Sequence, residues 1–315
     1  MVEWTKKHIL EIKDLTRQEM EVVFNLASSF KEVSQREVKK TPALRGKTVV
    51  NLFFENSTRT RTSFELAAKR LSADVLNFSS STSSISKGES VVDTIKNLES
   101  YRPDILIIRI DTGACLKNFL NYTRASIINA GDGKNEHPTQ ALLDMFTVKE
   151  VKGSLDNLNV LIVGDIMHSR VCRSNIFGFQ KFSSKVRVCG PPAFIPFEFE
   201  KLGVDVFYDL DRAIEDVDVI IMLRIQRERQ NLAYFSTLRE YVENFSLTPE
   251  RLKRAKKDCI VMHPGPVNWD VEISSTLKDE LHPLILKQVE NGLAIRMAVL
   301  YLVGAEKREH KTLRR

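Results

Sequence analysis

Small hydroxyl residues alternate with two arginines in one short segment, Ser57-Thr58-Arg59-Thr60-Arg61. An apolar run ends just before it, and a helical apolar stripe begins just after it at Phe64. At such a strand-to-helix turn the free backbone N–H groups, the hydroxyls and the guanidinium groups together suit a phosphate dianion. A simple capped helix with exposed arginines is the alternative, because Ser and Thr favour the N-cap. Two cations in the first turn favour the phosphate interpretation, since without an anion they oppose the helix dipole.

A second strand-to-helix turn carries a histidine and a carboxamide. It contains Glu136-His137-Pro138-Thr139-Gln140, in which Pro138 suits the first helical position. His137 and Gln140 are three residues apart, so both side chains can face one ligand. A lone histidine beside a helix start more often caps or packs, but this pairing indicates recognition of a carbonyl and an amide.

Two more arginines follow predicted strands in the second half of the chain. Arg170 comes shortly after the run 160–163, and Arg224 ends the run 219–223. Ligands of α/β domains bind at the carboxyl ends of parallel strands, where two arginines could clamp a dicarboxylate. For either arginine alone, surface ion pairing would be the preferred interpretation.

The last candidate segment is His263-Pro264-Gly265-Pro266, which follows another apolar run. Two prolines around a glycine make a stiff turn that can present backbone carbonyls to a ligand. A purely structural turn fits this segment equally well.

The elements that must position these residues alternate between apolar strands and amphipathic helices. Strand runs this apolar indicate parallel sheets covered on both faces, so we predict an α/β fold with two doubly wound parallel-sheet domains. The join between them is expected in the helix Pro138–Val151, and a last helix is expected over about Pro283–Val303. The predicted strands are Thr48–Phe54, Asp74–Phe78, Ile105–Ile110, Ile127–Ala130, Val160–Val163, Lys185–Val188, Val204–Tyr208, Val219–Leu223 and Ile260–His263; further helices are predicted at Ser63–Leu71, Ser90–Glu99 and Leu238–Asn244.

Bulk properties exclude several classes of protein. The net charge of +6 is modest and the basic residues are spread widely, so we expect no nucleic-acid partner. No apolar run reaches bilayer length and the start lacks a signal-peptide core, so we expect a cytoplasmic protein without membrane association. The four cysteines form no Cys-x-x-Cys pair, which argues against a structural zinc site. Neither a dinucleotide fingerprint nor a P-loop is present, and we expect no cofactor and no metal.

In this order, the four segments resemble those of the aspartate carbamoyltransferase family, and the resemblance spans nearly the whole chain. It implies transfer of a carbamoyl group from carbamoyl phosphate to L-aspartate, in a cleft between the two domains, as the committed step of pyrimidine synthesis. It also implies that the last helix returns to the first domain. The domains would then comprise residues 1–137 with 284–315, which bind carbamoyl phosphate, and residues 138–283, which bind aspartate.

The resemblance further implies a role for each site residue. Ser57, Thr58, Arg59, Thr60 and Arg109 would hold the phosphate, while Thr60, Arg109 and His137 polarise the carbamoyl oxygen. Gln140 and the carbonyls of Pro264 and Gly265 would bind the carbamoyl amide. Arg170, Arg224, Gln226 and Lys87 would grip aspartate.

Members of this family form homotrimers with shared active sites. A neighbouring subunit would donate Ser83 and Lys87 from the serine-rich segment 79–86 and its continuation. Whether the trimer associates further with dihydroorotase, with a regulatory chain or with neither stays open.

Two rival functions are weighed against this one. Ornithine carbamoyltransferases share the first two segments, but the pair Arg224 and Gln226 and the turn at Pro264 favour an anionic amino acid, because arginines repel ornithine. A non-catalytic relative would be expected to lack Arg59, His137 or the later arginines, and all are present. One departure concerns Trp269-Asp270, where many relatives have Arg-Gly; it leaves domain closure or partner docking in question more than the reaction.

Overall fold

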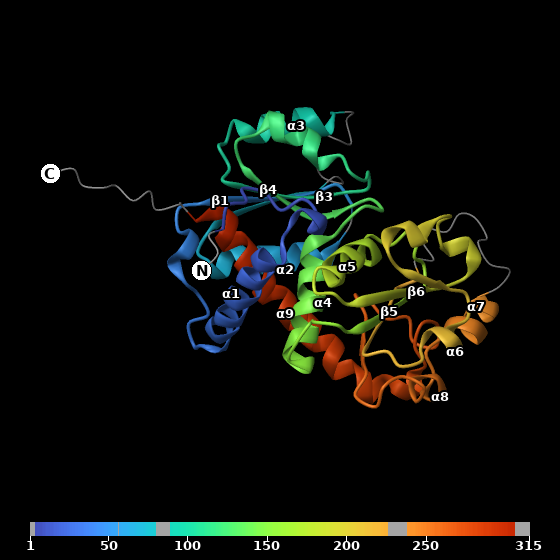
Figure 1. The fold of residues 1–315 in the computed structure, drawn as a ribbon. Helices are drawn as coiled ribbons and strands as arrows, with labels where there is room; N and C mark the ends of the chain where they lie inside the picture. Colours follow the sequence, from blue (N-terminus) through green and yellow to red (C-terminus); the bar gives the residue numbers. More distant parts are fainter. Residues whose placement is uncertain (1–3, 56, 80–88, 226–237, 306–315) are drawn as a thin grey trace.

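A computed structural model describes residues 4–55, 57–79, 89–225 and 238–305 (Figure 1). All of the predicted strands form, with ends that lie within two residues of the predicted ones, and they build two parallel sheets. The first has the strand order β2-β1-β3-β4, and the second β7-β6-β5-β8-β9. Their bounds are β1 Thr48–Phe53, β2 Asp74–Ser79, β3 Ile105–Ile110, β4 Ser126–Asp132, β5 Asn159–Val163, β6 Lys185–Cys189, β7 Asp205–Phe207, β8 Val219–Met222 and β9 Ile260–Met262. The predicted α/β fold with two parallel-sheet domains is confirmed.

The helices differ from the prediction mainly at their first residues. Helix α2 begins at Thr58 rather than Ser63, and α9 begins at Lys278, so that Pro283 lies inside the helix. The sequence pattern did not single out α1 and α5, nor the short helices α6 and α8. The α-helices are α1 Arg17–Gln35, α2 Thr58–Arg70, α3 Val91–Glu99, α4 Pro138–Lys152, α5 Arg170–Gln180, α6 Leu210–Ala213, α7 Leu238–Phe245, α8 Pro249–Leu252 and α9 Lys278–Gly304. Short 3₁₀ helices occur at Ile12–Asp14, Pro42–Leu44, Leu116–Tyr122, Pro192–Phe194, Phe199–Leu202 and Ser275–Leu277.

Alternation along the strands explains how the first sheet is covered. In β1, Val50 and Leu52 pack with α3, whereas Val49 and Phe53 pack with α1, α2 and α9 on the opposite face. Figure 1 shows α3 on one side of this sheet and α1, α2 and α9 on the other. Both faces of each strand are therefore apolar, which is why the strands appear in the sequence as continuous apolar runs.

One hydrophobic core joins the two sheets. It contains Ile105 and Ile107 from the first sheet, Val160 and Ile162 from the second, and buried residues of α4, α5 and α9 between them. Helix α9 packs against α1, α2 and α4, although it follows the strands of both sheets in the chain. The two halves therefore meet through a shared apolar interior.

Each sheet has a switch point, the place between two neighbouring strands where the strand order reverses direction. The chain moves outward from β1 to β2 and returns to β3 on the other side, and it does the same from β5 to β6 and β8. Crevices at the carboxyl ends of such neighbouring strands are the usual ligand sites of open α/β sheets. The hydroxyl-arginine segment and Arg109 lie at the first of these points, and Arg170 and Arg224 lie at the second.

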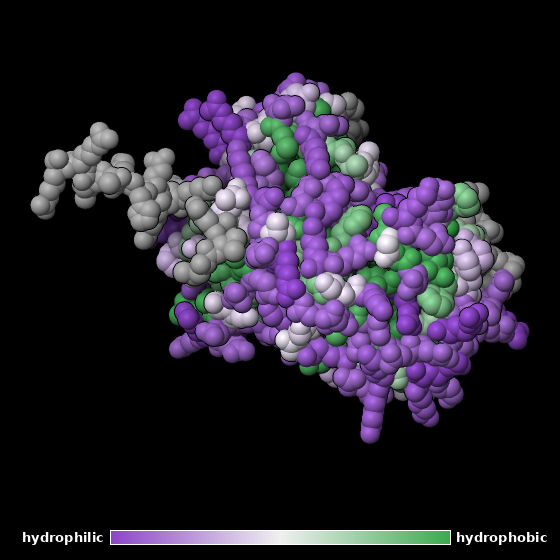
Figure 2. All heavy atoms as spheres, in the orientation of Figure 1, coloured by the Kyte–Doolittle hydropathy of each residue, from purple (hydrophilic) through white to green (hydrophobic). Residues whose placement is uncertain are grey.

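The surface, unlike the core, is mainly hydrophilic on the face that Figure 2 shows. Hydrophobic residues are visible there around α5 and the neighbouring strands. Within the described ranges, none of the helices combines the length and the apolar character needed to cross a membrane.

Candidate active site

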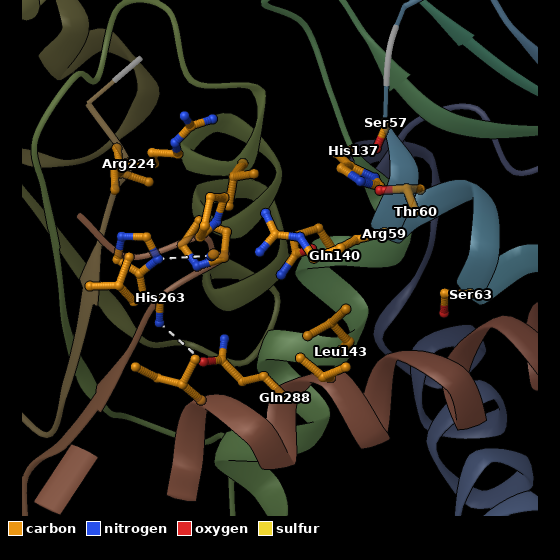
Figure 3. A pocket seen from close by; sticks show the side chains of 18 of the residues that line it. Ser57, Arg59, Thr60, Ser63, His137, Gln140, Leu143, Arg224, His263 and Gln288 are labelled. Carbon is orange, nitrogen blue, oxygen red and sulfur yellow. Dashed lines mark hydrogen bonds between the residues drawn. The ribbon is translucent and has the colours of Figure 1, made fainter. Parts of the chain in front are cut away.

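A cavity of about 820 Å³ lies between the two switch points and is lined by residues of both sheets (Figure 3). In the view of Figure 3, Ser57, Thr60 and His137 face Arg224 and His263 across the cavity, while Arg59 and Gln140 lie between them. The predicted site residues that line it are Ser57, Thr58, Arg59, Thr60, Arg109, His137, Gln140, Arg170, Arg224, Pro264 and Gly265. Residues more than two hundred positions apart in the chain are thus brought to one cavity.

The start of α2 forms one wall of the cavity. Ser57 is the N-cap residue, but its side chain makes no capping hydrogen bond. This result weakens the alternative that the hydroxyls serve only to cap the helix. The N–H groups of the first turn and the neighbouring hydroxyls can therefore serve an anion in the cavity.

The start of α4 forms the adjoining wall. His137 is the N-cap residue, again without a side-chain capping bond, and Pro138 takes the first helical position as predicted. His137 is only 4% exposed. Burial, and next the positive charge of Arg109, lower its pKa well below the ordinary value. A neutral imidazole is therefore present at neutral pH, and it can donate one N–H to a carbonyl oxygen.

Several guanidinium groups crowd around the same space. Burial, helped by Arg170 and Arg59, lowers the pKa of Arg109 to about 9, and burial lowers that of Arg170 to about 10. The pKa of Arg59 is also lowered, by burial and by Arg224. Arg109 Nε and Arg170 Nη1 are buried, and no hydrogen-bond partner for them lies among the described residues. Mutually repelling buried cations with unused N–H groups are the electrostatic signature of an anion site.

Glu55 offsets part of this charge. Both of its carboxylate oxygens accept hydrogen bonds from Arg170 Nη2 at 2.8 Å, and Arg109 Nη2 lies 3.2 Å from Oε1. Since Arg109 belongs to β3 and Arg170 begins α5, this carboxylate links the two sheets. Glu55 was not among the predicted site residues, because its partners are distant in the sequence.

The second sheet presents Arg224 just after β8. The next residue, Ile225, donates its N–H to Glu272 Oε1 at 2.8 Å, and the N–H of Asn268 donates to Glu272 Oε2 at 2.7 Å. Glu272 is fully buried. One carboxylate therefore fixes the segment after Arg224 to the turn that follows β9.

The turn after β9 is held close to the first domain. His263 Nδ1 accepts a hydrogen bond from the N–H of Gly265 at 2.8 Å, which puts its ring proton on Nε2. Gly265 has φ +66°, and a Cβ there would lie 2.7 Å from Arg59 Nη1. Only glycine allows this turn to approach the guanidinium so closely.

Arg296 and Gln288 of α9 also line the cavity and were not predicted. Arg296 is buried, donates to Ser63 Oγ at 2.8 Å, and has its pKa lowered to about 10 by burial and by Arg109. The sequence does contain a signal for Arg296: it is a charged residue within an otherwise apolar helical stripe, and such a residue needs a specific partner.

Of the pair Trp269 and Asp270, only Trp269 is among the residues that line the cavity. The Trp269 indole lines the cavity and packs edge-on against His282. Asp270 has φ +63°, a left-handed conformation that suits the glycine of many relatives, and its Oδ1 accepts from the N–H of Ser275 at 2.8 Å. A side-chain hydrogen bond therefore accompanies the left-handed conformation of Asp270 in this chain.

Three predicted site residues, Ser83, Lys87 and Gln226, lie outside the described residues. Among the residues that the structure describes, no group of three or more His, Cys, Asp or Glu side chains is placed to hold a metal ion.

Known proteins define the class to which this fold and site belong. Residues 7–150 match the carbamoyl-phosphate-binding domain of aspartate/ornithine carbamoyltransferases, and residues 156–303 match their Asp/Orn-binding domain. The chain therefore belongs to the aspartate/ornithine carbamoyltransferase family, and the predicted resemblance is confirmed.

Individual relatives show which branch of the family is most similar. The chain is 54% identical to the aspartate carbamoyltransferase catalytic subunit of Syntrophus aciditrophicus, over 96% of this chain and 98% of the relative. Aspartate transcarbamoylase of Trypanosoma cruzi, solved with carbamoyl phosphate and aspartate, is 32% identical with a TM-score of 0.84, over 95% of this chain and 97% of that one. Ornithine carbamoyltransferase of Pyrococcus furiosus is 28% identical with a TM-score of 0.85, over 98% and 100%. The backbone alone therefore does not separate the two activities.

Proposed function

We propose that this protein is an aspartate carbamoyltransferase, which joins carbamoyl phosphate and L-aspartate to give N-carbamoyl-L-aspartate and phosphate. The observation that carries the proposal is the meeting of Arg59, Arg109, Arg170 and Arg224 in one cavity, next to His137 and Gln140. Such a site suits two anionic substrates at once, one a phosphate ester and the other a dicarboxylate. This reaction is the committed step of pyrimidine synthesis.

Carbamoyl phosphate would bind at the starts of α2 and α4. The N–H groups and hydroxyls of Ser57, Thr58 and Thr60 would hold its phosphate, together with Arg59 and Arg109. The carbonyl oxygen would lie near Thr60, Arg109 and His137. The amide end would meet Gln140 and the backbone carbonyls of Pro264 and Gly265.

The chemistry then needs only orientation and charge stabilisation. The amine nitrogen of aspartate attacks the carbamoyl carbon, and the negative charge that develops on oxygen is stabilised by Arg109, Thr60 and neutral His137. The bond from carbon to the bridging oxygen breaks, and Arg59 stabilises the departing phosphate. The nitrogen loses one proton, for which that phosphate is a base within the same cleft.

Aspartate would bind against the second sheet, where Arg170 and Arg224 would grip its carboxylates with help from Gln226 and Lys87. The one acidic residue among those lining the cavity, in the described part of the chain, is Glu55, and two arginines engage its carboxylate. A second cation such as the ornithine side chain would meet like charge here, which favours aspartate. The names of the most similar sequence relatives point the same way.

The test is formation of ureido product from carbamoyl phosphate with either L-aspartate or L-ornithine. We expect turnover with aspartate alone. Turnover with ornithine alone would refute the specificity argument while leaving the phosphate site intact. If neither amine reacts, and a phosphonate bisubstrate analogue does not bind, the proposed activity is wrong.

We also propose a homotrimer in the cytoplasm, with Ser83 and Lys87 of one subunit completing the site of the next. Four free cysteines fit a reducing compartment. Mixing inactive Arg59→Ala and Lys87→Ala variants tests the sharing, because some hybrid sites would carry neither substitution and regain activity. Absence of any recovery after subunit exchange would contradict shared sites.

The division into two substrate-binding units is part of the same proposal. Residues 1–137 with 284–315 would bind carbamoyl phosphate, and residues 138–283 would bind aspartate. The packing of α9 against α1 and α2 supports this division.

A further inference from the structure

A buried carboxylate lies directly behind the cavity. Asp144 is on α4, one helical turn after Gln140, and is fully buried. Its Oδ1 accepts hydrogen bonds from Gln140 Nε2 at 3.0 Å and from Gln288 Nε2 at 2.8 Å, and its Oδ2 accepts from Asn175 Nδ2 at 3.0 Å. Three amide side chains from α4, α5 and α9 therefore converge on one carboxylate.

The chemistry of a carboxylate decides which way each amide points. Burial raises the pKa of Asp144 to about 6, so the group is still mostly ionised at neutral pH. An ionised carboxylate accepts hydrogen bonds and donates none, so each amide must turn its NH₂ toward it. For Gln140 this leaves Oε1 as the atom available to a ligand in the cavity, since no donor to it lies among the described residues.

The same carboxylate acts on the opposite side of the cavity through Gln288. With its Nε2 turned to Asp144, Gln288 presents Oε1 to the N–H of His263, which donates to it at 3.0 Å (Figure 3). His263 is the first residue of the turn that contains Pro264 and Gly265. Asp144 thereby orients the side-chain acceptor of Gln140 and, through one more residue, the turn that carries two backbone acceptors.

We propose that Asp144 is a positioning residue that makes the site select the amide end of carbamoyl phosphate over a methyl ketone or acetyl group of the same shape. The inference rests on the proposed function, because it concerns the carbamoyl end of that substrate. An NH₂ group donates two hydrogen bonds, whereas a methyl group donates none. If Gln140 were free to turn over, its own NH₂ could face the ligand, and two donors would meet.

A purely structural role for Asp144 predicts something different. Loss of a buried hydrogen-bonding centre would lower stability and weaken all ligands of the cavity alike. Loss of a positioning residue instead changes the preference between an amide and a ketone that carry the same phosphonate group. The ratio of the affinities for the amide and the ketone therefore distinguishes a positioning role from a purely structural one.

The experiment measures dissociation constants by titration calorimetry for phosphonoacetamide, phosphonoacetone and inorganic phosphate. We expect the unsubstituted protein to bind the amide about tenfold more tightly than the ketone, the size of one or two hydrogen bonds. Asp144→Ala should reduce this preference to less than about twofold, with phosphate affinity changed far less. Asp144→Ser is the second variant, because its hydroxyl keeps the site polar for folding but can donate as well as accept.

Thr147→Val is the matched control. Thr147 is fully buried one turn further along α4, and its hydroxyl accepts from Asn291 Nδ2 of α9 at 2.9 Å. This variant removes a buried hydrogen bond between the same two helices without touching Gln140 or Gln288. Its preference for the amide should stay unchanged.

The outcomes separate the inference from the function on which it rests. If the unsubstituted protein binds neither analogue, the proposed function fails and this inference fails with it. If the unsubstituted protein prefers the amide and a folded Asp144→Ala or Asp144→Ser variant keeps the full preference, only the role of Asp144 is overturned.

Discussion

Two opposite sides of the cavity present positive charge in different ways. We call the starts of α2 and α4, with Arg109, the first wall, and the segments after β5 and β8 the second wall. On the first wall, Arg59 and Arg109 stand beside the N-termini of α2 and α4, so side-chain charges and backbone N–H groups converge on one small volume. On the second wall, Arg170 and Arg224 follow two different strands and are fixed by separate carboxylates, directly by Glu55 and through the next residue by Glu272. Converging donors suit a single small dianion such as a phosphate, whereas separated cations suit the two carboxylates of a longer dicarboxylate.

The largest effect is expected from breaking the first wall. Arg59→Ala should lower kcat by about a thousandfold, because in the proposed mechanism this guanidinium stabilises the charge of the departing phosphate. Arg61→Ala is the control: it lies in the same turn but does not line the cavity, and its activity should stay within about threefold. Steady-state kinetics with both substrates would check this, and near-normal turnover in Arg59→Ala would refute the phosphate assignment.

A smaller and more selective effect is expected on the second wall. Arg224→Ala should raise the KM for aspartate about 10- to 100-fold, the size of a lost hydrogen bond between charged groups. The KM for carbamoyl phosphate should change little, because that ligand is proposed to bind the other wall. An equal rise of both KM values would mean that the two walls do not act separately.

The pH dependence of the free energy of unfolding tests whether His137, on the first wall, is buried as a neutral imidazole. Its folded-state pKa lies well below the unfolded value, so below about pH 6.5 the unfolded chain takes up a proton that the folded chain does not. This linkage removes stability as the pH falls, by about 1.4 kcal/mol per pH unit. His137→Asn should lose that contribution, which urea unfolding at pH 5.5, 6.5 and 7.5 would reveal. Parallel curves for the two proteins over this range would contradict a buried neutral histidine.

The smallest effect is expected at Trp269. Trp269→Arg restores the residue of many relatives, but the Trp269 indole packs against His282 and is not among the groups proposed to bind substrate. We expect kcat and both KM values to stay within about threefold, as for a surface substitution. A larger change in kcat alone would instead point to domain closure.

Much of the fold could be read from the sequence because the strands are buried on both faces. The first four residues of β3, Ile105–Ile108, are all apolar, and strands covered by helices on both faces typically have that pattern. Helix starts were less predictable. The first turn of α2 faces the cavity and carries no apolar stripe. The sequence predicts a helix start at Pro283, but α9 begins at Lys278, because a proline in the second turn removes only one hydrogen bond.

The site was predictable where chemistry is concentrated in short segments. The turns at Ser57 and His137 combine several polar groups within a few residues, so local reasoning finds them. Glu55 bonds to partners on other elements, and Asp144 bonds to Gln288 of α9 as well as to Gln140 of its own helix. The distant partners lie at separations along the chain that no local pattern encodes. Such residues become visible only when the packing of α4, α5 and α9 is known.

The position of α9 has a consequence for synthesis on the ribosome. This helix is made after both sheets, yet it covers the face of the first sheet that α1 and α2 leave incomplete. Once α4 has been translated, the first domain must wait for α9 for on the order of ten seconds at typical elongation rates. During that interval its apolar surface is exposed, so a premature stop before Lys278 would release a chain prone to aggregation rather than a folded amino-terminal half.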